Sequence, residues 1–216
     1  MLTIEIVSDI VCPWCYIGTP RLAAAAAMIR QEHPDFSYRA VWRPFFLNPD
    51  TPPEGEPYLP FLIAKFGSRE QVEEIFARVR AAGAPYGLAY AFEKIALRAN
   101  TLQAHRLLHW AQTVNPEQHM IDALVERLFA AQFQRGEHVG DPAVLVACAA
   151  ECGYDAQAVA DYLASGRDTE EVRQRVAEVQ QMGINMVPTF ILPNREIIVG
   201  AEDPSILAAG IRRALQ

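Results

Sequence analysis

The sequence carries its strongest indication of fold between residues 3 and 15, in the run Thr3-Ile4-Glu5-Ile6-Val7-Ser8-Asp9-Ile10-Val11-Cys12-Pro13-Trp14-Cys15. Its first five residues are β-branched or apolar apart from one acid, which is typical of a buried strand. A C-x-x-C pair follows, and Pro13 favours the first turn of a helix, where the backbone N–H that proline lacks would have no partner. The run therefore predicts a strand that leads through two cysteines into a helix.

The residues that follow extend this unit to β-α-β. Residues 21–29 include five consecutive alanines and have the strongest helix propensity in the chain. Residues 36–42 alternate apolar or aromatic with polar side chains, which predicts a second strand. Between Asn48 and Pro60, five prolines interrupt every periodicity, so we place a boundary near residue 50.

Residues 51–165 contain helix signals and no strand signal, so we predict a large all-helical insertion. Ser68-Arg69-Glu70-Gln71 is a capping box, and the apolar helical face after it ends near Gly83. Starts and ends of further helices are indicated at Thr101 to Val114, from Asn115-Pro116 onward, at Asp141-Pro142 to Gly153, and at Asp155 to Gly166.

Residues 166–216 return to a mixture of helix and strand. The expected elements are a helix with an Asp168/Glu171 capping box that ends near Gly183, strands over residues 187–192 and 196–199 that form a hairpin, and a last helix capped by Asp203-Pro204. Together with residues 1–50, these elements give the order β-α-β … α-β-β-α. The chain is therefore predicted to be an α/β unit that a helical insertion divides.

The composition excludes several classes of function. The chain has 216 residues, of which 51% are hydrophobic and 21% charged, so it is an ordinary globular protein rather than a disordered one. Its net charge of −7 provides no positive field for a nucleic acid or an anionic membrane. The start of the chain has no basic region, and its longest early apolar stretch, Leu22 to Ile29, is too short to cross a bilayer. We therefore expect a cytoplasmic protein with no nucleic-acid or membrane partner.

The C-x-x-C pair has the spacing of a redox centre. Only a thiolate is nucleophilic, and an ordinary cysteine with a pKa of about 8.5 is mostly protonated at neutral pH. At a helix N-terminus, unpaired N–H groups and the helix dipole stabilise the anion. We expect Cys12 to be the more exposed nucleophile and Cys15, one turn later, to be the resolving cysteine. An exposed Trp14 would place an apolar surface beside the reactive sulfur.

A zinc site and a second redox pair are the alternatives for the four cysteines. A four-cysteine zinc site would have to join Cys12 and Cys15 to Cys148 and Cys152, more than 130 residues away, so no metal is expected. Cys148 and Cys152 are four residues apart and share one helix face, where a disulfide would be strained. They are either two small buried side chains or an auxiliary redox pair.

Three stretches together resemble the thioredoxin-fold disulfide oxidoreductases of the DsbA superfamily, and within it the cytosolic FrnE-like branch. They are residues 8–18 with the Cys12-Pro13-Trp14-Cys15 motif, residues 100–107 with His105, and residues 183–190 with Val187-Pro188-Thr189. The resemblance implies a thioredoxin-like domain over residues 1–50 and 166–216 and a helical insertion domain over residues 51–165.

The resemblance also implies roles for individual residues. Pro188 is expected to be cis, to pack against the cysteine pair and to discourage metal binding, while the Val187 backbone holds an extended substrate segment. His105 is expected near the opening of the active site, where it would either tune the thiolate or pack as an ordinary helix residue. Related enzymes often carry a buried acid where this chain has Ile6. Glu5 is therefore either the candidate proton relay for Cys15 or a solvated residue at the sheet edge, and Asp9 is expected to end the strand.

These observations predict a cytosolic thiol-disulfide oxidoreductase that exchanges its Cys12/Cys15 pair with protein or small-molecule thiols, with glutathione among the candidates, and that has no bound cofactor. A glutathione-dependent isomerase or kappa-type transferase is the first alternative, because the same superfamily contains both. Those enzymes usually keep a single reactive group at the helix start, so the presence of Cys15 favours exchange. A metal-binding or interaction module is the second alternative.

Overall fold

A computed structural model describes residues 1–114 and 117–216 of the chain. Its centre is a four-stranded sheet of order β2-β1-β5-β6, in which β1 and β2 are parallel and the other neighbours are antiparallel. The strands are β1 (Leu2–Ser8), β2 (Tyr38–Pro44), β5 (Thr189–Ile191) and β6 (Ile197–Val199). The predicted β-α-β unit and the later hairpin are therefore confirmed.

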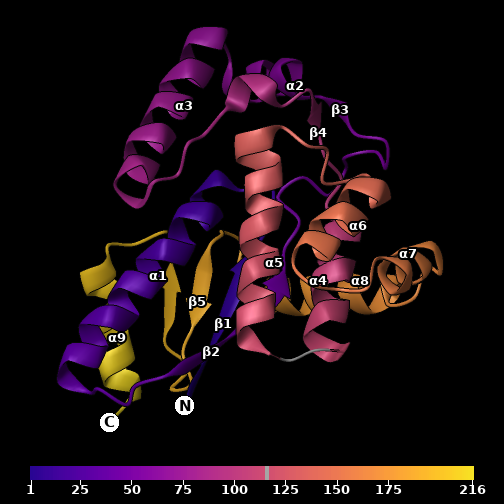
Figure 1. Cartoon of the computed structure of the whole chain (residues 1–216). Helices are drawn as coiled ribbons and strands as arrows, with labels where there is room; N and C mark the ends of the chain where they lie inside the picture. Colours follow the sequence, from indigo (N-terminus) through magenta and orange to yellow (C-terminus); the bar gives the residue numbers. More distant parts are fainter. Residues whose placement is uncertain (115–116) are drawn as a thin grey trace.

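Helices cover both faces of this sheet (Figure 1). Ile4 and Ile6 of β1 belong to the core that includes α1 (Pro13–Glu32) and α9 (Pro204–Ala214). Val7 points to the opposite face, where it packs with Val179 of α8 (Thr169–Gln181). Because side chains alternate along a strand, each residue of β1 can be assigned to one of these two faces.

The insertion forms the rest of the molecule and contains most of the remaining helices. They are α2 (Tyr58–Phe66), α3 (Arg69–Gly83), α4 (Leu102–Val114), α5 (Gln118–Ala130), which continues as a π-helical turn (Ala131–Arg135), α6 (Pro142–Glu151) and α7 (Ala156–Ala164), with short 3-10 turns at Ala84–Tyr86 and Phe92–Lys94. The helix start predicted at Asn115-Pro116 lies outside the described residues. No helix in the described part of the chain is long and apolar enough to cross a membrane.

The prediction that the insertion is all-helical is wrong. Its two short strands, β3 (Glu56–Pro57) and β4 (Leu97–Arg98), pair in an antiparallel ladder. Two-residue strands are too short to show an alternating pattern, so nothing in the sequence indicates them. Gly55 precedes the ladder with φ +78°, and a Cβ there would lie 2.8 Å from the Arg98 carbonyl oxygen.

The second predicted capping box is also wrong. Asp168 precedes α8 with φ 60°, in the left-handed region, and its side chain bonds no N–H of the helix. Its carboxylate instead accepts the Tyr162 hydroxyl of α7 at 3.0 Å. The tertiary contact has replaced the local cap, and only the first capping box, in which Ser68 accepts the Gln71 N–H, is confirmed.

The outer edge of the sheet at β2 is closed by two glutamine side chains. The Gln112 amide of α4 accepts the Trp42 N–H at 2.8 Å and donates to the Trp42 carbonyl at 3.2 Å. The Gln118 carbonyl of α5 accepts the Ala40 N–H at 3.0 Å. An open strand edge is prone to pair with other chains, so these amides both attach the insertion to the sheet and protect its edge.

Replacing Gln112 with leucine is expected to lower the free energy of unfolding by about 1–3 kcal/mol, because the backbone N–H and the backbone carbonyl of Trp42 both lose their hydrogen-bond partner. Urea denaturation measures the change. In the control, Gln157→Leu removes an amide that bonds Asp161 on the exposed side of α7, and should alter stability by no more than about 0.5 kcal/mol. Equal losses in both variants would contradict the role assigned to Gln112.

Candidate functional site

Cys12 lies where the chain turns from β1 into α1. Its backbone is extended (φ −94°, ψ 110°), and its N–H donates to the Asp9 carbonyl at 3.0 Å. Cys12 is the N-cap of α1, with Pro13 as the first helical residue, and its sulfur accepts the Cys15 N–H at 3.3 Å. The sulfur therefore occupies the position where a serine or aspartate oxygen usually caps a helix, facing the positive end of the dipole.

Cys15 lies one turn along α1 and behind Cys12. Burial raises the pKa of the Cys15 thiol well above its usual value, and a hydrogen bond to Cys12 and the negative charge of Cys12 raise it further. Cys15 is therefore a protonated thiol at neutral pH while Cys12 is free. The Ser8 hydroxyl and the Asp9 backbone oppose this shift, so they are the polar groups that face Cys15 from the end of β1.

Exposure does not separate the two cysteines as predicted, because both are buried, with 3% and 2% of their surfaces accessible. The two cysteines differ instead in whether a ligand in a neighbouring cavity can reach them. Cys12 lines a cavity of about 270 Å³ together with Trp14 and Val187, and Cys15 is not in its lining. Trp14 is 38% exposed, as expected for a residue at the opening. The assignment of Cys12 as nucleophile is thus supported by a different observation from the one predicted.

The Val187–Pro188 segment adjoins the pair, and its peptide bond is cis, as the resemblance implied. The Cys12 thiol donates to the Val187 carbonyl across 3.7 Å. The α1 backbone comes close to this segment at Gly18, where a Cβ would lie 3.1 Å from Pro188 Cγ. A glycine in the second turn of α1 therefore lets the helix and the proline loop meet beside the two sulfurs.

His105 is fully enclosed behind Cys12 rather than at the opening. Its Nε2 lies 3.2 Å from Asp9 Oδ1 and 3.1 Å from the Phe45 carbonyl, and because both are acceptors this nitrogen carries the proton. The other Asp9 oxygen accepts the Leu47 N–H at 2.8 Å. His105 and Asp9 thus hold the loop whose backbone binds the Cys12 N–H. Asp9 was expected only to end the strand, and its buried carboxylate had no signal in the sequence.

The geometry contradicts the role predicted for Glu5. Glu5 shares the α8 face of β1 with Val7, whereas the cysteines lie on the α1 face. Its carboxylate pairs with Arg43 at 2.8 Å, and Arg43 also contacts Glu178 of α8. Glu5 therefore contributes to packing of the sheet against α8, whereas Ser8 lies on the same face of β1 as Ile4 and Ile6, toward the cysteines.

Cys148 and Cys152 lie at the end of α6, away from this pair, and are not bridged. Cys148 is completely buried, and burial raises its pKa to about 11. Burial also raises the pKa of Cys152. Both are therefore poor nucleophiles at neutral pH, which favours the interpretation as small buried side chains. Among the described residues, no group of three or more potential ligands is placed to hold a metal.

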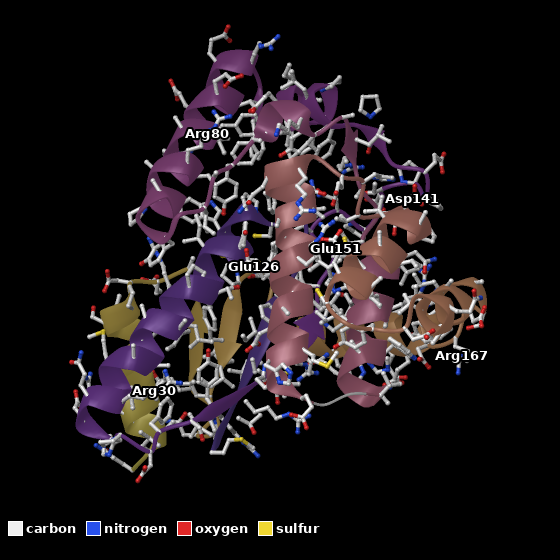
Figure 2. All side chains as sticks on the ribbon, viewed as in Figure 1. Arg30, Arg80, Glu126, Asp141, Glu151 and Arg167 are labelled. Carbon is white, nitrogen blue, oxygen red and sulfur yellow. The ribbon has the colours of Figure 1, made fainter. Side chains whose placement is uncertain are left out.

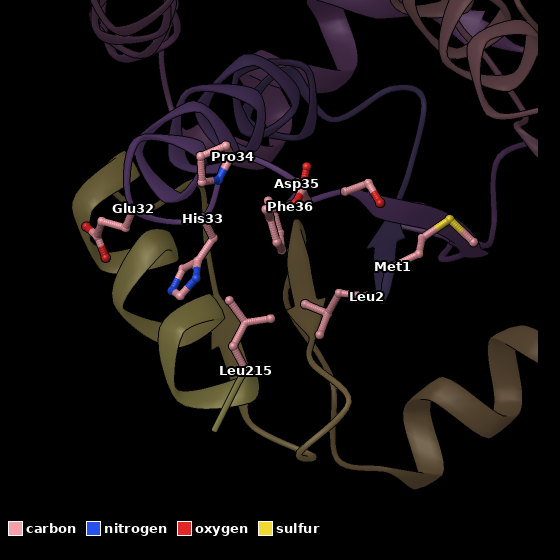
Figure 3. Close-up of a pocket in the computed structure, with 9 residues that line it drawn as sticks. Met1, Leu2, Glu32, His33, Pro34, Asp35, Phe36 and Leu215 are labelled. Carbon is pink, nitrogen blue, oxygen red and sulfur yellow. The ribbon is translucent and has the colours of Figure 1, made fainter.

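A second hollow lies at the opposite end of β1 (Figure 3). Its lining includes Leu2 at the start of that strand and Leu215 near the end of the chain. Cys12 follows the other end, and a seven-residue strand is about 20 Å long. This hollow is therefore too distant to take part in chemistry at the cysteines.

The fold and the cysteine site define the class of protein. Residues 3–212 match the family described as the DSBA-like thioredoxin domain, and the chain belongs to that family. The probable DsbA oxidoreductase SCO1869 from Streptomyces coelicolor is 32% identical and superimposes with a TM-score of 0.87, covering 100% of this chain and 90% of that one.

Two further proteins are similar over nearly their whole lengths. The uncharacterized protein YwbO of Bacillus subtilis (strain 168) is 25% identical over 209 residues, which are 96% of this chain and 94% of that protein. The cytosolic disulfide reductase DsbM from Pseudomonas aeruginosa, solved with GSH, is 18% identical, with a TM-score of 0.69 and 99% of each chain covered. At that identity the second likeness concerns the fold alone.

Iodoacetamide at about pH 7.5 is expected to alkylate Cys12 first, because Cys15 and Cys148 are buried thiols whose raised pKa values keep them protonated. Peptide mapping after timed quenching measures each rate. The rate of modification of Cys148 should rise about tenfold per pH unit, with its thiolate fraction, and level off only above pH about 11. In urea all four cysteines should react alike, and equal rates for Cys12 and Cys15 in the folded protein would contradict the assignment.

Proposed function

We propose that this protein is a thiol-disulfide oxidoreductase that cycles Cys12 and Cys15 between dithiol and disulfide. The observation that carries the proposal is that the two sulfurs lie in different environments. Cys12 caps α1 and borders a cavity, whereas Cys15 is a buried, protonated thiol in the next turn. One cysteine is thus available to a substrate while the other is kept for the second step.

The first step is attack of the Cys12 thiolate on a substrate disulfide. The substrate S–S bond breaks, a Cys12–substrate disulfide forms, and the other substrate sulfur leaves as a thiolate. The Cys15 N–H, which bonds the Cys12 sulfur at 3.3 Å, stabilises the thiolate before attack. Cys15 then attacks the Cys12 sulfur, forms the internal disulfide and releases the second thiolate.

Formation of the mixed disulfide removes two of the effects that raise the pKa of Cys15. In the free protein, the hydrogen bond to Cys12 and the charge of Cys12 both raise the pKa of Cys15. Once Cys12 is in a mixed disulfide it has no negative charge, while the Ser8 hydroxyl and the Asp9 backbone, which lower the pKa of Cys15, remain. Cys15 therefore loses its proton more readily when its attack is required.

The presence of two cysteines favours exchange over glutathione-dependent isomerisation or transfer, which needs one reactive group. The proposal includes activity in the cytosol, and the similarity of fold to the cytosolic disulfide reductase DsbM supports it. The reduction potential of the pair, measured against a glutathione buffer, decides whether the protein oxidises or reduces its substrates.

Cys12→Ser is expected to lower dithiothreitol-dependent insulin reduction to the uncatalysed background, because the attacking sulfur is lost. Cys15→Ser should instead accumulate mixed disulfides at Cys12, since nothing resolves them. Insulin turbidity and intact-mass spectrometry measure the two effects. Wild-type activity in both variants would reject the proposal, and glutathione conjugation that survives Cys15→Ser would establish the transferase alternative.

The double variant Cys148→Ala/Cys152→Ala is expected to retain nearly full insulin reduction, because neither thiol reaches the Cys12 cavity. Circular dichroism confirms that the variant is folded. A loss of more than about tenfold in activity with intact folding would instead establish these cysteines as an auxiliary redox pair.

A further inference from the structure

We propose that the cavity beside Cys12 binds a low-molecular-weight disulfide or thiol whose compact aromatic body carries one carboxylate, and that Arg98 binds this carboxylate. The inference rests on the proposed exchange at Cys12 and names the class of substrate. It follows from the size of the cavity, its aromatic side, the charges in its lining and one buried hydrogen-bond donor.

The cavity is small and mostly apolar. Its volume of about 270 Å³ is slightly below that of typical ligand sites, which are about 300–1,000 Å³. Phe76 of α3 and Phe92 stack with ring centres 4.1 Å apart, and Tyr58 of α2 stacks on Phe76 at 6.3 Å. Because the rings stack on one another, they turn their edges rather than their faces to the cavity, and ring edges suit the face of an aromatic ligand better than a branched chain.

Arg98 supplies the buried donor. Only 8% of its surface is accessible, and it lines the cavity. Its Nη2 donates to Glu56 across the β3–β4 ladder, and its guanidinium lies 3.7 Å from the centre of the Phe61 ring. Its Nε is buried and has no hydrogen-bond partner among the described residues. Glu56 takes only Nη2, so the guanidinium of Arg98 lines the cavity with further N–H groups, and a carboxylate on a ligand would accept a hydrogen bond from them.

The charges of the lining select an anion. Among the described residues that line the cavity, two are cations, Arg98 and Lys65, and none is an aspartate or glutamate. Lys65 lies at the exposed rim, where its ammonium contacts the Asn48 amide at 3.2 Å. Glutathione would bring an ammonium that no carboxylate of the lining balances, and burying such a charge is costly. A monocarboxylate avoids this cost.

The chemistry at the site balances as two thiol-disulfide exchanges. The Cys12 thiolate attacks one sulfur of the aryl disulfide, whose S–S bond breaks and releases the first aryl thiolate. Attack of Cys15 on Cys12 then releases the second aryl thiolate. The disulfide gains two electrons, the Cys12/Cys15 dithiol loses two, and the two thiol protons pass to solvent or to the leaving thiolates.

The test compares three disulfides with the reduced protein: the disulfide of para-mercaptobenzoate, diphenyl disulfide and glutathione disulfide. Intact-mass spectrometry measures the rate of protein oxidation, and each rate is divided by that of free cysteine with the same disulfide. The mercaptobenzoate disulfide is expected to be favoured about tenfold or more over each of the others, since a hydrogen bond to a charged group contributes about that factor. No preference over diphenyl disulfide, or a preference for glutathione disulfide, would overturn the inference.

Arg98→Met removes the cation and keeps much of the side-chain bulk, so the ratio of the mercaptobenzoate disulfide rate to the diphenyl disulfide rate should fall to about one, a ratio that a general loss of activity would not change. Arg80→Met is the matched control. Arg80, labelled in Figure 2, also pairs with a glutamate, Glu93, and lies over the Phe92 ring, but it is outside the lining of this cavity. Its variant should retain the preference. Equal preference in the Arg98→Met and wild-type proteins would overturn the inference.

A second variant keeps the inference testable if Arg98→Met does not fold. Ile75 of α3 lines the cavity and is only half-buried, so Ile75→Trp would fill the cavity without disturbing the ladder. It should slow both aryl disulfides about tenfold and leave exchange with cystamine, which is small and flexible, unchanged. Unaltered aryl rates would overturn the inference, whereas loss of exchange with every disulfide in the wild-type protein would instead reject the proposed function.

Discussion

The site depends on a single constraint: the sulfur of Cys12 caps the helix that begins directly after it. The cap requires β1 to end at a fixed place, and the packing of Ile4 and Ile6 beneath α1 provides that. Cys15 is the third residue of the helix, so its N–H is a donor that an N-cap side chain ordinarily reaches. The same bond that completes the helix end thus stabilises the thiolate, so stability and reactivity have one origin.

The helical insertion holds this helix end in place. The Tyr90 hydroxyl donates to the Pro13 carbonyl at 2.7 Å, directly inside the first turn of α1. The Tyr16 ring stacks on Phe129 of α5 at 5.1 Å, and its hydroxyl donates to Glu126, which Figure 2 labels on the same helix. Residues from both parts of the chain therefore form the candidate site, and the insertion supplies the aromatic side of its cavity.

Those features that depend on local chemistry could be predicted from the sequence. The buried strand, the proline at the helix start and the C-x-x-C spacing each express a preference of nearby residues. The β3–β4 ladder, the left-handed Asp168 and the burial of Asp9 depend on partners 6 to 96 residues away. The error at Glu5 has another cause, since strand periodicity does not indicate which face of the sheet receives α1.

The replacement of a buried acid by Ile6 is compatible with exchange because charge on Cys12 itself regulates Cys15. An acid beneath the pair would oppose ionisation of both sulfurs and would have to move a proton in each cycle. Here the opposing charge is the Cys12 thiolate, which disappears in the mixed disulfide. The Ser8 hydroxyl and the Asp9 backbone then face Cys15 without a competing anion. Two neutral groups can therefore favour the Cys15 anion at that stage, and the proton passes to solvent or to the leaving thiolate.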